Sequence, residues 1–459
     1  MKTKEIVILG AGISGLATAY WLKKAGFSVE ILEASSQPGG AMETVFEDGF
    51  LVDYGPNSGL ETTPLIKQIV NEVGLSEQMI YANEEGNKRY ILKNNNLYPL
   101  PMGLLPFLKT KLFSIKGKLR LFCEPFVGKS QDGYYQSIAQ FVTRRLGPEF
   151  LKYAIDPFVS GVFAGDPEKL SVKSAFPKLY RLEELYGGLI KGMIRGARER
   201  KKRAEQSKQN AKMFSFKDGM QVFPKAIAEK LSLDISYNSI VNRIEKTNEL
   251  YYIHYTKNGK EHVKSCNNLL STIPAHKLSN IINILDLKLS KQLQNIIYPP
   301  VIVLYLGYNK ADIGRDLDGF GFLIPSSEKK NFLGAIWSST IFINRSESKN
   351  ASFTIFIGGA RHLDLLANDI NKVINTAVKE FESMMNITAA PILKKYKVWE
   401  HAIPQYNIGY IENDRAVEKC EDTNKGFFIS GNFCGGISVG DCIKNSELVA
   451  GKIIEYISK

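Results

Sequence analysis

The chain has 459 residues, of which 44% are hydrophobic and 23% are charged, and this length exceeds one ordinary hydrophobic core, so two or three compact regions are expected. No run of eighteen apolar residues occurs, so we expect no transmembrane helix. The formal net charge of +12 calls for an acidic partner, which leaves nucleic acid, an anionic membrane surface and an acidic substrate to be distinguished.

The first elements along the chain form a predicted βαβ unit. Residues 5–9 are predicted as a buried strand, residues 14–25 as a helix and residues 28–33 as a second strand. Because the segment before the first strand lacks the apolar core of a signal peptide, we expect a cytoplasmic protein. The five cysteines include no CxxC pair, which argues against a disulfide framework or a zinc site and fits the same compartment.

The rest of the chain changes character several times. Residues 100–210 have a helical pattern and include a basic segment from Arg195 to Arg203 that continues to Lys208 and Lys212. We expect that segment to be solvated. Strands are predicted at 235–255, 268–272, 298–308, 320–325 and 332–337, a helix at 369–386, and a strand, a glycine loop and a helix between Phe427 and Tyr456.

The loop after the first strand has the spacing of a dinucleotide-binding motif. Gly10 permits a tight turn, Gly12 lets the backbone approach a diphosphate, and Gly15 allows the helix to pack on the strand. Glu33 ends the second strand, where its carboxylate can accept hydrogen bonds from ribose hydroxyl groups. A structural turn is the alternative. The predicted diphosphate loop consists of Gly10, Ala11, Gly12, Ile13, Ser14 and Gly15.

A second glycine pair, Gly39 and Gly40, follows Glu33 and resembles the diphosphate-contacting extension of the amine oxidase and phytoene desaturase group of flavoproteins. The resemblance implies FAD as the cofactor. The sequence departs from that group at Ala41, where many members have arginine, so a backbone contact is expected there. The implied cofactor contacts are Ala34, Gly40, Ala41 and, in a loop close to the flavin ring, Gly55, Pro56, Asn57 and Ser58; for that loop a plain turn is the alternative.

A third glycine-rich segment, between Ile429 and Cys442, predicts a cofactor region assembled from both ends of the sequence. A strand leads into Gly431, and Asp441 is predicted to cap the helix that follows. An ordinary strand-to-helix loop is the alternative. In the group that it resembles, this segment contacts the flavin ring, which implies contacts at Gly431, Asn432, Ile437, Ser438 and Val439. Val241 resembles a valine that contacts adenine, although a core role is as plausible for a strand valine.

Motifs in the middle of the chain resemble those of the protoporphyrinogen oxidase family. They are residues 157–167, Leu170-Ser171, residues 175–177, Leu182-Glu183, Gly219-Met220-Gln221, Gly319-Phe320-Gly321, and Trp399 with residues 402–406. The resemblance spans essentially the whole chain and implies a cofactor contact at Trp399. It also implies four substrate contacts: Arg89 pairs with a propionate, the Gly161 carbonyl faces pyrrole N–H groups, Phe320 stacks on a pyrrole ring, and Val303 sandwiches the macrocycle.

The resemblance implies a fold and a reaction. The fold is α/β: a split Rossmann-type FAD-binding domain (1–85, 211–275 and 396–459), an inserted mixed-sheet substrate domain (86–98 and 276–395) and an inserted helical domain (99–210). The reaction is the oxidation of protoporphyrinogen IX to protoporphyrin IX, a late step of heme biosynthesis, with flavin as hydride acceptor and molecular oxygen as final oxidant. Since flavin carries the chemistry, no catalytic side chain and no metal is expected, and the five histidines are expected at the surface or in loops.

Several alternatives stay open. Coproporphyrinogen III carries more carboxylates and would favour a more basic pocket, although the block at 175–192 looks more like the protoporphyrinogen-specific enzymes. An amine oxidase and a flavin-binding scaffold without turnover are more distant readings. The family's helical domain associates with membranes, so residues 99–108 and the basic segment form either a peripheral contact with the inner face of the cell membrane or a surface buried against the protein. A monomer and a homodimer both fit, and no nucleic acid partner is expected.

Overall fold

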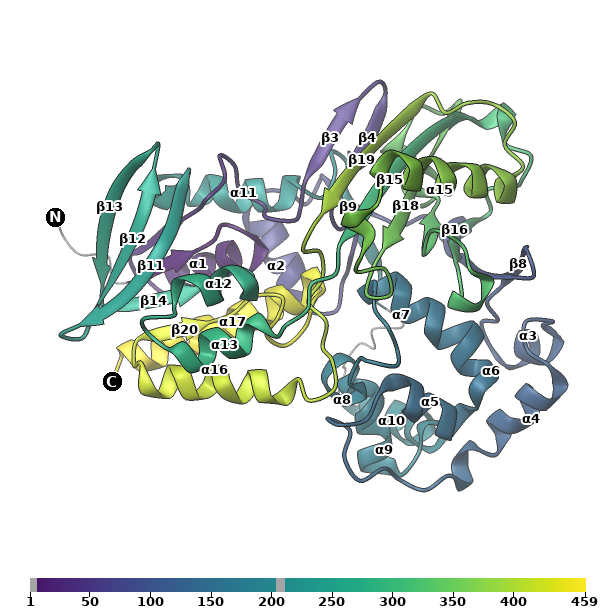
Figure 1. Cartoon of the computed structure of the whole chain (residues 1–459), viewed down its shortest axis with the longest axis horizontal. Coiled ribbons are helices and arrows are strands. Elements are labelled where there is room, and N and C mark those ends of the chain that lie inside the picture. The colour runs from purple at the N-terminus through teal and green to yellow at the C-terminus, as the bar shows by residue number, and fades with distance from the viewer. Residues whose placement is uncertain (1–5, 204–210) are drawn as a thin grey trace.

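The computed structural model describes residues 6–203 and 211–459. The later part of the basic segment, including Lys208, lies outside the described residues. Three regions surround the centre of the molecule in Figure 1: a region around a parallel sheet, a region around a large mixed sheet, and a cluster of helices. This arrangement confirms the predicted α/β fold.

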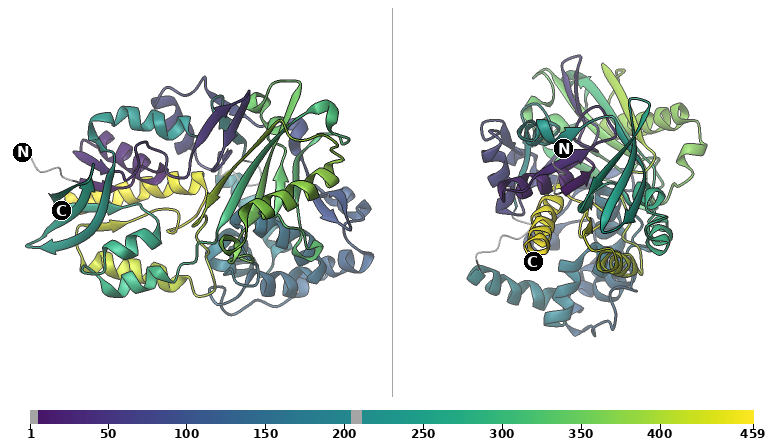
Figure 2. Two further views of the ribbon diagram at one scale, coloured as in Figure 1. Left: turned by 45° about the horizontal axis from the view of Figure 1, so that its top comes forward. Right: turned by 90° about the vertical axis from the view of Figure 1, so that its left-hand side faces the viewer.

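A five-stranded parallel sheet forms the centre of the first region. Its order is β10 (Ile235–Ser236), β2 (Val29–Leu32), β1 (Ile6–Leu9), β14 (Asn268–Ser271) and β20 (Phe427–Ile429). Such strands are buried on both faces, which explains the unbroken apolar runs in β1 and β20. In Figure 2, helix α17 (Val439–Ile457), in yellow, lies along α1 (Ile13–Lys24), in purple, so segments far apart in sequence form one layer.

The other elements of this region surround the parallel sheet. An antiparallel sheet packs on one face of the parallel sheet and contains β11 (Ser239–Thr247), β12 (Leu250–Lys257) and β13 (Lys260–Cys266). A hairpin of β3 (Thr44–Glu47) and β4 (Phe50–Asp53) reaches toward the second region. The remaining elements are β5 (Gly59–Leu60), β6 (Met79–Tyr81), β9 (Met213–Phe216), α2 (Pro64–Glu72), α11 (Val222–Lys230), α12 (Ala275–Ile281), α13 (Leu287–Gln294) and α16 (Ile411–Thr423).

A seven-stranded mixed sheet forms the second region. Its order is β19 (Leu393–Trp399), β15 (Val301–Asn309), β18 (Asn350–Gly358), β17 (Gly334–Ile336), β16 (Gly319–Leu323), β7 (Lys88–Lys93) and β8 (Asn96–Pro99). Only the β16 and β7 pair is parallel among these described strands. The amphipathic helix α15 (Ile370–Met385) covers one face with Phe381 and its neighbours, and α14 (Ser338–Ile341) follows β17 and contacts β18 and β16.

The third region contains helices from the middle of the sequence. They are α3 (Leu104–Lys109), α4 (Ile115–Phe122), α5 (Ile138–Leu146), α6 (Pro148–Phe150), α7 (Asp156–Phe163), α8 (Val172–Ala175), α9 (Pro177–Tyr186) and α10 (Leu189–Arg203). No helix within residues 6–203 and 211–459 is long and apolar enough to span a bilayer.

A buried arginine holds several of these helices together. Arg145 on α5 is fully buried and lies 2.6 Å from Glu124 (Nη1 to Oε1), and it also pairs with Glu183 on α9. Glu124 accepts the backbone N–H groups of Leu189 at 2.7 Å and Ile190 at 3.1 Å, at the start of α10. The helical region is therefore organised around a satisfied ionic network.

The division into three domains stays a prediction, and the packing differs from it at one boundary. Residues 276–395 are predicted to belong to the substrate domain, but α12 and α13 pack on the first region. Leu278 and Leu293 of these helices share a core with Leu269 of β14 and Phe427 of β20. Sequence periodicity identifies an apolar helix face and not the partner that covers it, so this boundary could not be set from the pattern.

Candidate active site

The first glycine loop lies at the carboxyl end of β1. Gly10 has φ = +97°, and its N–H donates to the Leu32 carbonyl at 2.8 Å. A Cβ at position 15 would lie 2.0 Å from the Gly10 oxygen, so glycine is required for α1 to pack this closely. A Cβ at position 12 would meet no described atom within 4 Å, and no described side chain caps α1. The loop therefore offers an open face and free N-terminal N–H groups, which suit a diphosphate.

The second glycine pair lies directly on the first loop. The Gly39 N–H donates to the Ala11 carbonyl at 3.0 Å, and a Cβ at Gly40 would lie 3.3 Å from the Gly12 Cα. Glu33 also lies beside the first glycine loop, because its carboxylate accepts the Ala11 N–H at 2.6 Å. The predicted neighbours lie here as well: Ser14 is buried, Ile13 is half-buried, and Ala34 and Ala41 are exposed.

The predicted adenine contact is near Glu33. The Ser239 N–H, at the start of β11, donates to the Glu33 carbonyl at 2.8 Å. Val241 follows two residues later on the same strand and is half-buried. The structure thus brings Val241 close to Glu33 in the chain fold, while the contacts of these residues with ribose and adenine stay predictions.

Loop 53–58 packs on the second glycine segment. A Cβ at Gly55 would lie 1.7 Å from the Ala41 oxygen, so only glycine fits. Ser215 Oγ donates to the Asn57 carbonyl at 3.1 Å, and Trp399 Nε1 donates to the Tyr54 carbonyl at 2.8 Å. Pro56 and Ser58 are half-buried in the same loop. Trp399, on the second region's sheet, therefore meets the loop predicted to lie close to the flavin.

A buried ion pair supports this loop and was missed by the sequence analysis. Asp53 lies 3.2 Å from Arg345 (Oδ2 to Nη2), and it also accepts the Thr44 hydroxyl at 2.6 Å and the Met220 N–H at 3.0 Å. Burial raises the pKa of Asp53, and the Arg345 guanidinium opposes that rise. Arg345 is distant in sequence and belongs to no motif, so only the fold reveals its role.

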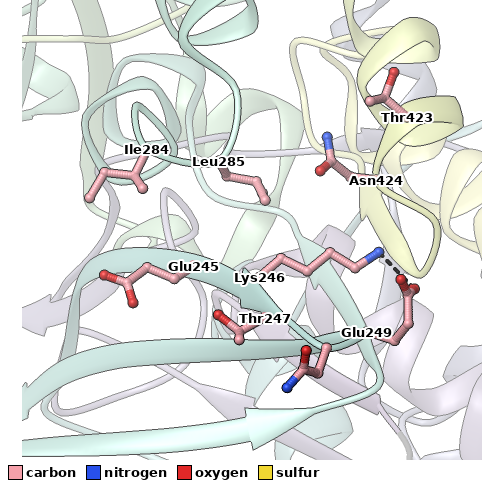
Figure 3. Close-up of a pocket in the computed structure, with 9 residues that line it drawn as sticks. Glu245, Lys246, Thr247, Glu249, Ile284, Leu285, Thr423 and Asn424 are labelled. Atoms are coloured by element: carbon pink, nitrogen blue, oxygen red, sulfur yellow. Dashed lines mark ion pairs between the residues drawn. The ribbon is translucent and has the colours of Figure 1, made fainter.

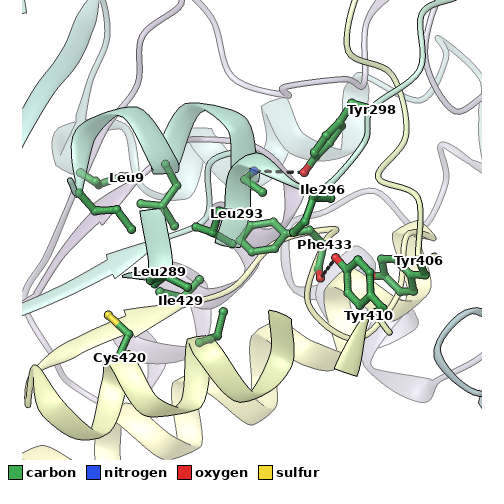
Figure 4. Close-up of a cluster of buried hydrophobic side chains, with 14 of the residues drawn as sticks. Leu9, Leu289, Leu293, Ile296, Tyr298, Tyr406, Tyr410, Cys420, Ile429 and Phe433 are labelled. Carbon is green, nitrogen blue, oxygen red and sulfur yellow. Dashed lines mark hydrogen bonds between the residues drawn. The ribbon is translucent and has the colours of Figure 1, made fainter. Parts of the chain in front are cut away.

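The third glycine segment is held by tyrosine side chains. The Tyr406 hydroxyl donates to the Asn432 carbonyl at 2.7 Å and accepts the Gly436 N–H at 3.0 Å. Beside it, the Tyr410 hydroxyl donates to the Phe433 carbonyl at 2.7 Å (Figure 4). Burial raises the pKa of both tyrosines well above the usual value of 10. Their hydroxyls therefore stay protonated and keep donating to the segment that contains Gly431 and Asn432.

The predicted cap of α17 is wrong. Ser438 caps the helix, and its hydroxyl accepts the Asp441 N–H at 3.2 Å. Asp441 lies in the first turn and accepts the Ser438 hydroxyl at 2.6 Å, because the helix already begins at Val439. A Cβ at Gly440 would lie 2.6 Å from Thr62 Oγ1, so this end of α17, preceded by Ile437, meets the chain just beyond loop 53–58.

Two of the predicted substrate residues meet on the second sheet. The register of β16 against β7 shifts between Gly319 and Gly321, so Phe320 is a bulge residue. The Arg89 guanidinium lies 5.3 Å from the centre of the Phe320 ring. Although Arg89 is exposed, the protein atoms around it desolvate the guanidinium and lower its pKa. Among the described residues, no carboxylate pairs with Arg89.

The other two predicted substrate residues lie along the same sheet. Val303 on β15 is buried and pairs across the strands with Phe356. A Cβ at Gly161 on α7 would lie 2.6 Å from Leu323 Cδ2, so α7 packs over β16. Because side chains alternate along each strand, Val303, Leu323 and Arg89 lie on the same face of the sheet. Four strand spacings, or about 19 Å, separate the strand of Val303 from the strand of Arg89. The face is thus long and mainly apolar.

The expectation that the histidines lie at the surface or in loops is wrong for His276. It lies on α12, half-buried, and its ring stacks on His401 with 4.3 Å between the ring centres. Burial lowers the pKa of His276 to about 4, and His401 and Lys277 lower it further. The other histidines are on strands at the surface or in loops. Within the described residues, no group of His, Cys, Asp and Glu has the arrangement of a metal site.

A separate pocket of about 580 Å³ lies at the far end of β11 from Val241. Glu245, Lys246, Ile284 and Asn424 are among its lining residues, and Lys246 pairs with Glu249 at its edge (Figure 3). None of these residues belongs to the glycine loops or to the long face of the second sheet. The pocket is therefore separate from the candidate active site.

The geometry defines a flavoprotein of the split dinucleotide-binding type, and the comparisons agree. The chain matches the flavin containing amine oxidoreductase family over residues 13–454 and belongs to that family. FAD is its cofactor. The diphosphate site fits this group, because the open face at Gly12 and the uncapped α1 are what a diphosphate requires.

Individual relatives are named after porphyrinogen chemistry. The chain is 31% identical to protoporphyrinogen oxidase 2, chloroplastic/mitochondrial, of Arabidopsis thaliana, over 99% of this chain and 94% of that protein. It is 26% identical to coproporphyrinogen III oxidase of Bacillus subtilis (strain 168), over 99% and 98%. A crystal structure from Exiguobacterium sp. 255-15, provisionally named protoporphyrinogen oxidase, has a TM-score of 0.81 at 20% identity and covers all of both chains.

Proposed function

We propose that the chain is an FAD-dependent porphyrinogen oxidase that converts protoporphyrinogen IX to protoporphyrin IX with molecular oxygen as the final acceptor. The observation that carries the proposal is the apolar face of the second sheet, about 19 Å across, with Trp399 near one end and the unpaired Arg89 near the other. A large flat substrate with a carboxylate fits such a face. The full-length similarity to protoporphyrinogen oxidases supports this substrate class.

The chain's own residues bind and orient the substrate. Arg89 pairs with a propionate, for which a planar guanidinium is suited. Phe320 stacks on a pyrrole ring, the Gly161 carbonyl accepts pyrrole N–H groups, and Val303 packs on the macrocycle beside Trp399. FAD supplies the hydride acceptor. Because these side chains are neither acids nor bases apart from Arg89, their contribution is to position the macrocycle and to exclude water.

Sequence similarity favours protoporphyrinogen over coproporphyrinogen as the substrate. The chain is 31% identical to the protoporphyrinogen oxidase of Arabidopsis thaliana and 26% identical to the coproporphyrinogen III oxidase of Bacillus subtilis. Arg89 has no carboxylate partner among the described residues, whereas the adjacent Lys88 pairs with Asp318 at 2.6 Å. The Arg89 guanidinium is therefore available to pair with a propionate.

Anaerobic reduction of the bound flavin tests the reaction. The purified holoenzyme is mixed without oxygen with protoporphyrinogen IX or coproporphyrinogen III, and the loss of flavin absorbance is followed. We expect faster bleaching with protoporphyrinogen IX, and reoxidation when oxygen is admitted. Faster bleaching with coproporphyrinogen III would assign the alternative substrate, and no bleaching with either would favour an amine oxidase or a flavin-binding scaffold.

Replacing Arg89 tests the carboxylate contact. We expect Arg89→Ala to raise KM for protoporphyrinogen IX about tenfold or more, since a hydrogen-bonded charge is worth roughly 1.5–3 kcal/mol. FAD content should not change, because Arg89 lies outside the glycine loops. Lys88→Ala is the matched control, and its KM should stay close to that of the wild type. Unchanged kinetics in Arg89→Ala would contradict the role.

We further propose that α3 and α4 contact an anionic membrane from the cytoplasmic side. Large apolar side chains are exposed on these helices, such as Leu105 at 70% and Ile115 at 78%, and beside them, such as Met102 at 79% and Phe126 at 90%. Lysines and Arg120 alternate with them along α4, a pattern that suits the boundary between headgroups and acyl chains.

Vesicle flotation tests this contact. The wild type should float with anionic vesicles at low salt, and Leu105→Glu should float several-fold less. Ile343→Glu removes an equally exposed apolar side chain outside the helical region, so it should behave like the wild type. Absence of the wild type from the vesicle fraction would exclude the membrane contact.

A further inference from the structure

Two ion pairs join the β3–β4 hairpin region to strand β19. Lys395 lies 2.5 Å from Glu47, and Lys397 pairs with Glu43. Each lysine comes from β19, on the second sheet, and each glutamate comes from β3 or the residue just before it, in the cofactor-binding region. All four side chains are between about a quarter and two-fifths exposed. The two pairs are therefore alike in chemistry, setting and topology.

Of the two ion pairs, only Lys397 with Glu43 belongs to a closed ring of contacts at the predicted flavin site. Lys397 Nζ lies 4.4 Å from the centre of the Trp399 ring. Trp399 Nε1 donates to the Tyr54 carbonyl at 2.8 Å, and the Tyr54 N–H donates to the Glu43 carbonyl at 2.9 Å. The Glu43 carboxylate pairs with Lys397, which closes the ring of contacts.

This ring of contacts joins residues predicted to contact the cofactor and the substrate. Tyr54 precedes Gly55 of the flavin loop, and Glu43 follows the segment of Gly40 and Ala41. Lys397 also lies directly opposite Val303 in the pairing of β19 with β15. A cation on an indole face, held in place by a carboxylate, restricts the ring to one orientation. Lys395 pairs with Glu47 instead, two residues away on the same strand, and among the described residues only Lys397 places its ammonium group over the Trp399 ring.

We propose that Lys397 is a positioning residue for the flavin. Its ammonium group, held by Glu43, fixes the Trp399 ring and the Glu43 to Tyr54 connection, so that the flavin loop has its binding geometry before FAD arrives. Preorganisation of this kind raises affinity by removing the cost of ordering the site on binding. The inference rests on the proposed contacts of Trp399 and loop 53–58 with FAD, and it adds a residue for which no cofactor or substrate contact is predicted.

The test is FAD affinity, measured by titrating FAD into the full-length apo-protein and following flavin fluorescence. Lys397→Met should weaken FAD binding about tenfold, and Glu43→Gln, the second variant, should weaken it to a similar extent. Lys397→Arg keeps a cation over the indole and should retain affinity within about twofold of the wild type. Lys395→Met is the matched control and should also stay within about twofold. Thermal unfolding of each apo-protein checks that the chain is folded.

The outcomes separate this inference from the cofactor assignment. Trp399→Phe should weaken FAD binding, and adding Lys397→Met to it should cause a smaller loss than Lys397→Met causes in the wild type, because part of the effect of Lys397 passes through the ring. If Trp399→Phe weakens binding while Lys397→Met does not, the positioning role is overturned and the cofactor contact stands. Equal losses in Lys395→Met and Lys397→Met overturn it as well, since they indicate general docking of the two regions. If Trp399→Phe binds FAD normally, the proposed contact of Trp399 fails, and the inference fails with it.

Discussion

Gly12→Ala is expected to give a folded chain that has lost FAD. A Cβ at position 12 would meet no described protein atom within 4 Å, so the substitution costs the apo-protein little. The same space lies over the N-terminus of α1, where the diphosphate has to approach the backbone. Loss of two hydrogen bonds to that charged group, each worth roughly 1.5–3 kcal/mol, predicts at least about a 100-fold loss of affinity.

The ratio of flavin to protein absorbance in the purified chain, followed by FAD titration, measures this effect. Gly451→Ala is the control, because a Cβ at position 451 on α17 also meets no described atom within 4 Å but lies away from the glycine loops. It should retain full FAD content. A Gly12→Ala chain with wild-type FAD content would show that the diphosphate does not approach this loop.

Arg145→Met is expected to cause the largest loss of stability, about 3–5 kcal/mol. The substitution leaves Glu124 and Glu183 without their shared guanidinium, in an environment where both side chains are almost fully buried. Breaking a buried pair by removing one partner is costly because the remaining charges stay desolvated. A fall in the midpoint of thermal unfolding, measured by circular dichroism, is the readout.

Arg144→Met is the matched control for this prediction. Arg144 is the neighbouring residue and also pairs with Glu183, at 3.0 Å, but its side chain is 28% exposed. Its loss should therefore cost about 1 kcal/mol or less. Equal destabilisation by the two substitutions would contradict the assignment of Arg145 as the centre of the network.

The same network predicts acid sensitivity. Burial raises the pKa of Glu183, but hydrogen bonds from Arg145, the Ser130 N–H and Arg144 lower it more, so it lies below its usual value of 4.5. Because the folded-state pKa is depressed, this carboxylate stabilises the fold fully above pH 4.5. That contribution is lost as the pH falls from 4.5 through the lowered value.

Much of the fold was predictable because its strongest signals are local. The strand and helix at the start of the chain, observed as Ile6–Leu9 and Ile13–Lys24, follow from an apolar run, a glycine turn and small residues. The amphipathic helix Ile370–Met385 follows from its periodicity. The strands Asn350–Gly358 and Leu393–Trp399 were not predicted, although the first lies inside the second sheet and the second forms one of its edges. Both pair with β15, which is distant from them in sequence, so their pairing leaves no local pattern.

The residues of the candidate site likewise divide into those that the sequence predicts and those that only the fold reveals. The glycine segments could be found because each glycine meets a steric requirement that leaves a trace in the sequence, as at Gly15 and Gly55. Arg345 and Lys397 could not be found, because their partners Asp53 and Glu43 lie about 300 residues away in the chain. Side chains that act through a tertiary contact carry no local pattern, so the residues that support the site are known only from the fold.

The pairing of β20 with β14 and of α17 with α1 also constrains how the protein is made. The glycine loop near Gly10 is synthesised first, but the segment around Gly431 and the helix that ends at Ile457 come from the last part of the described sequence. A nascent chain on the ribosome therefore has only the N-terminal part of the predicted cofactor site for most of the synthesis of the described residues. The complete predicted site can form only after the segment around Gly431 and α17 have emerged.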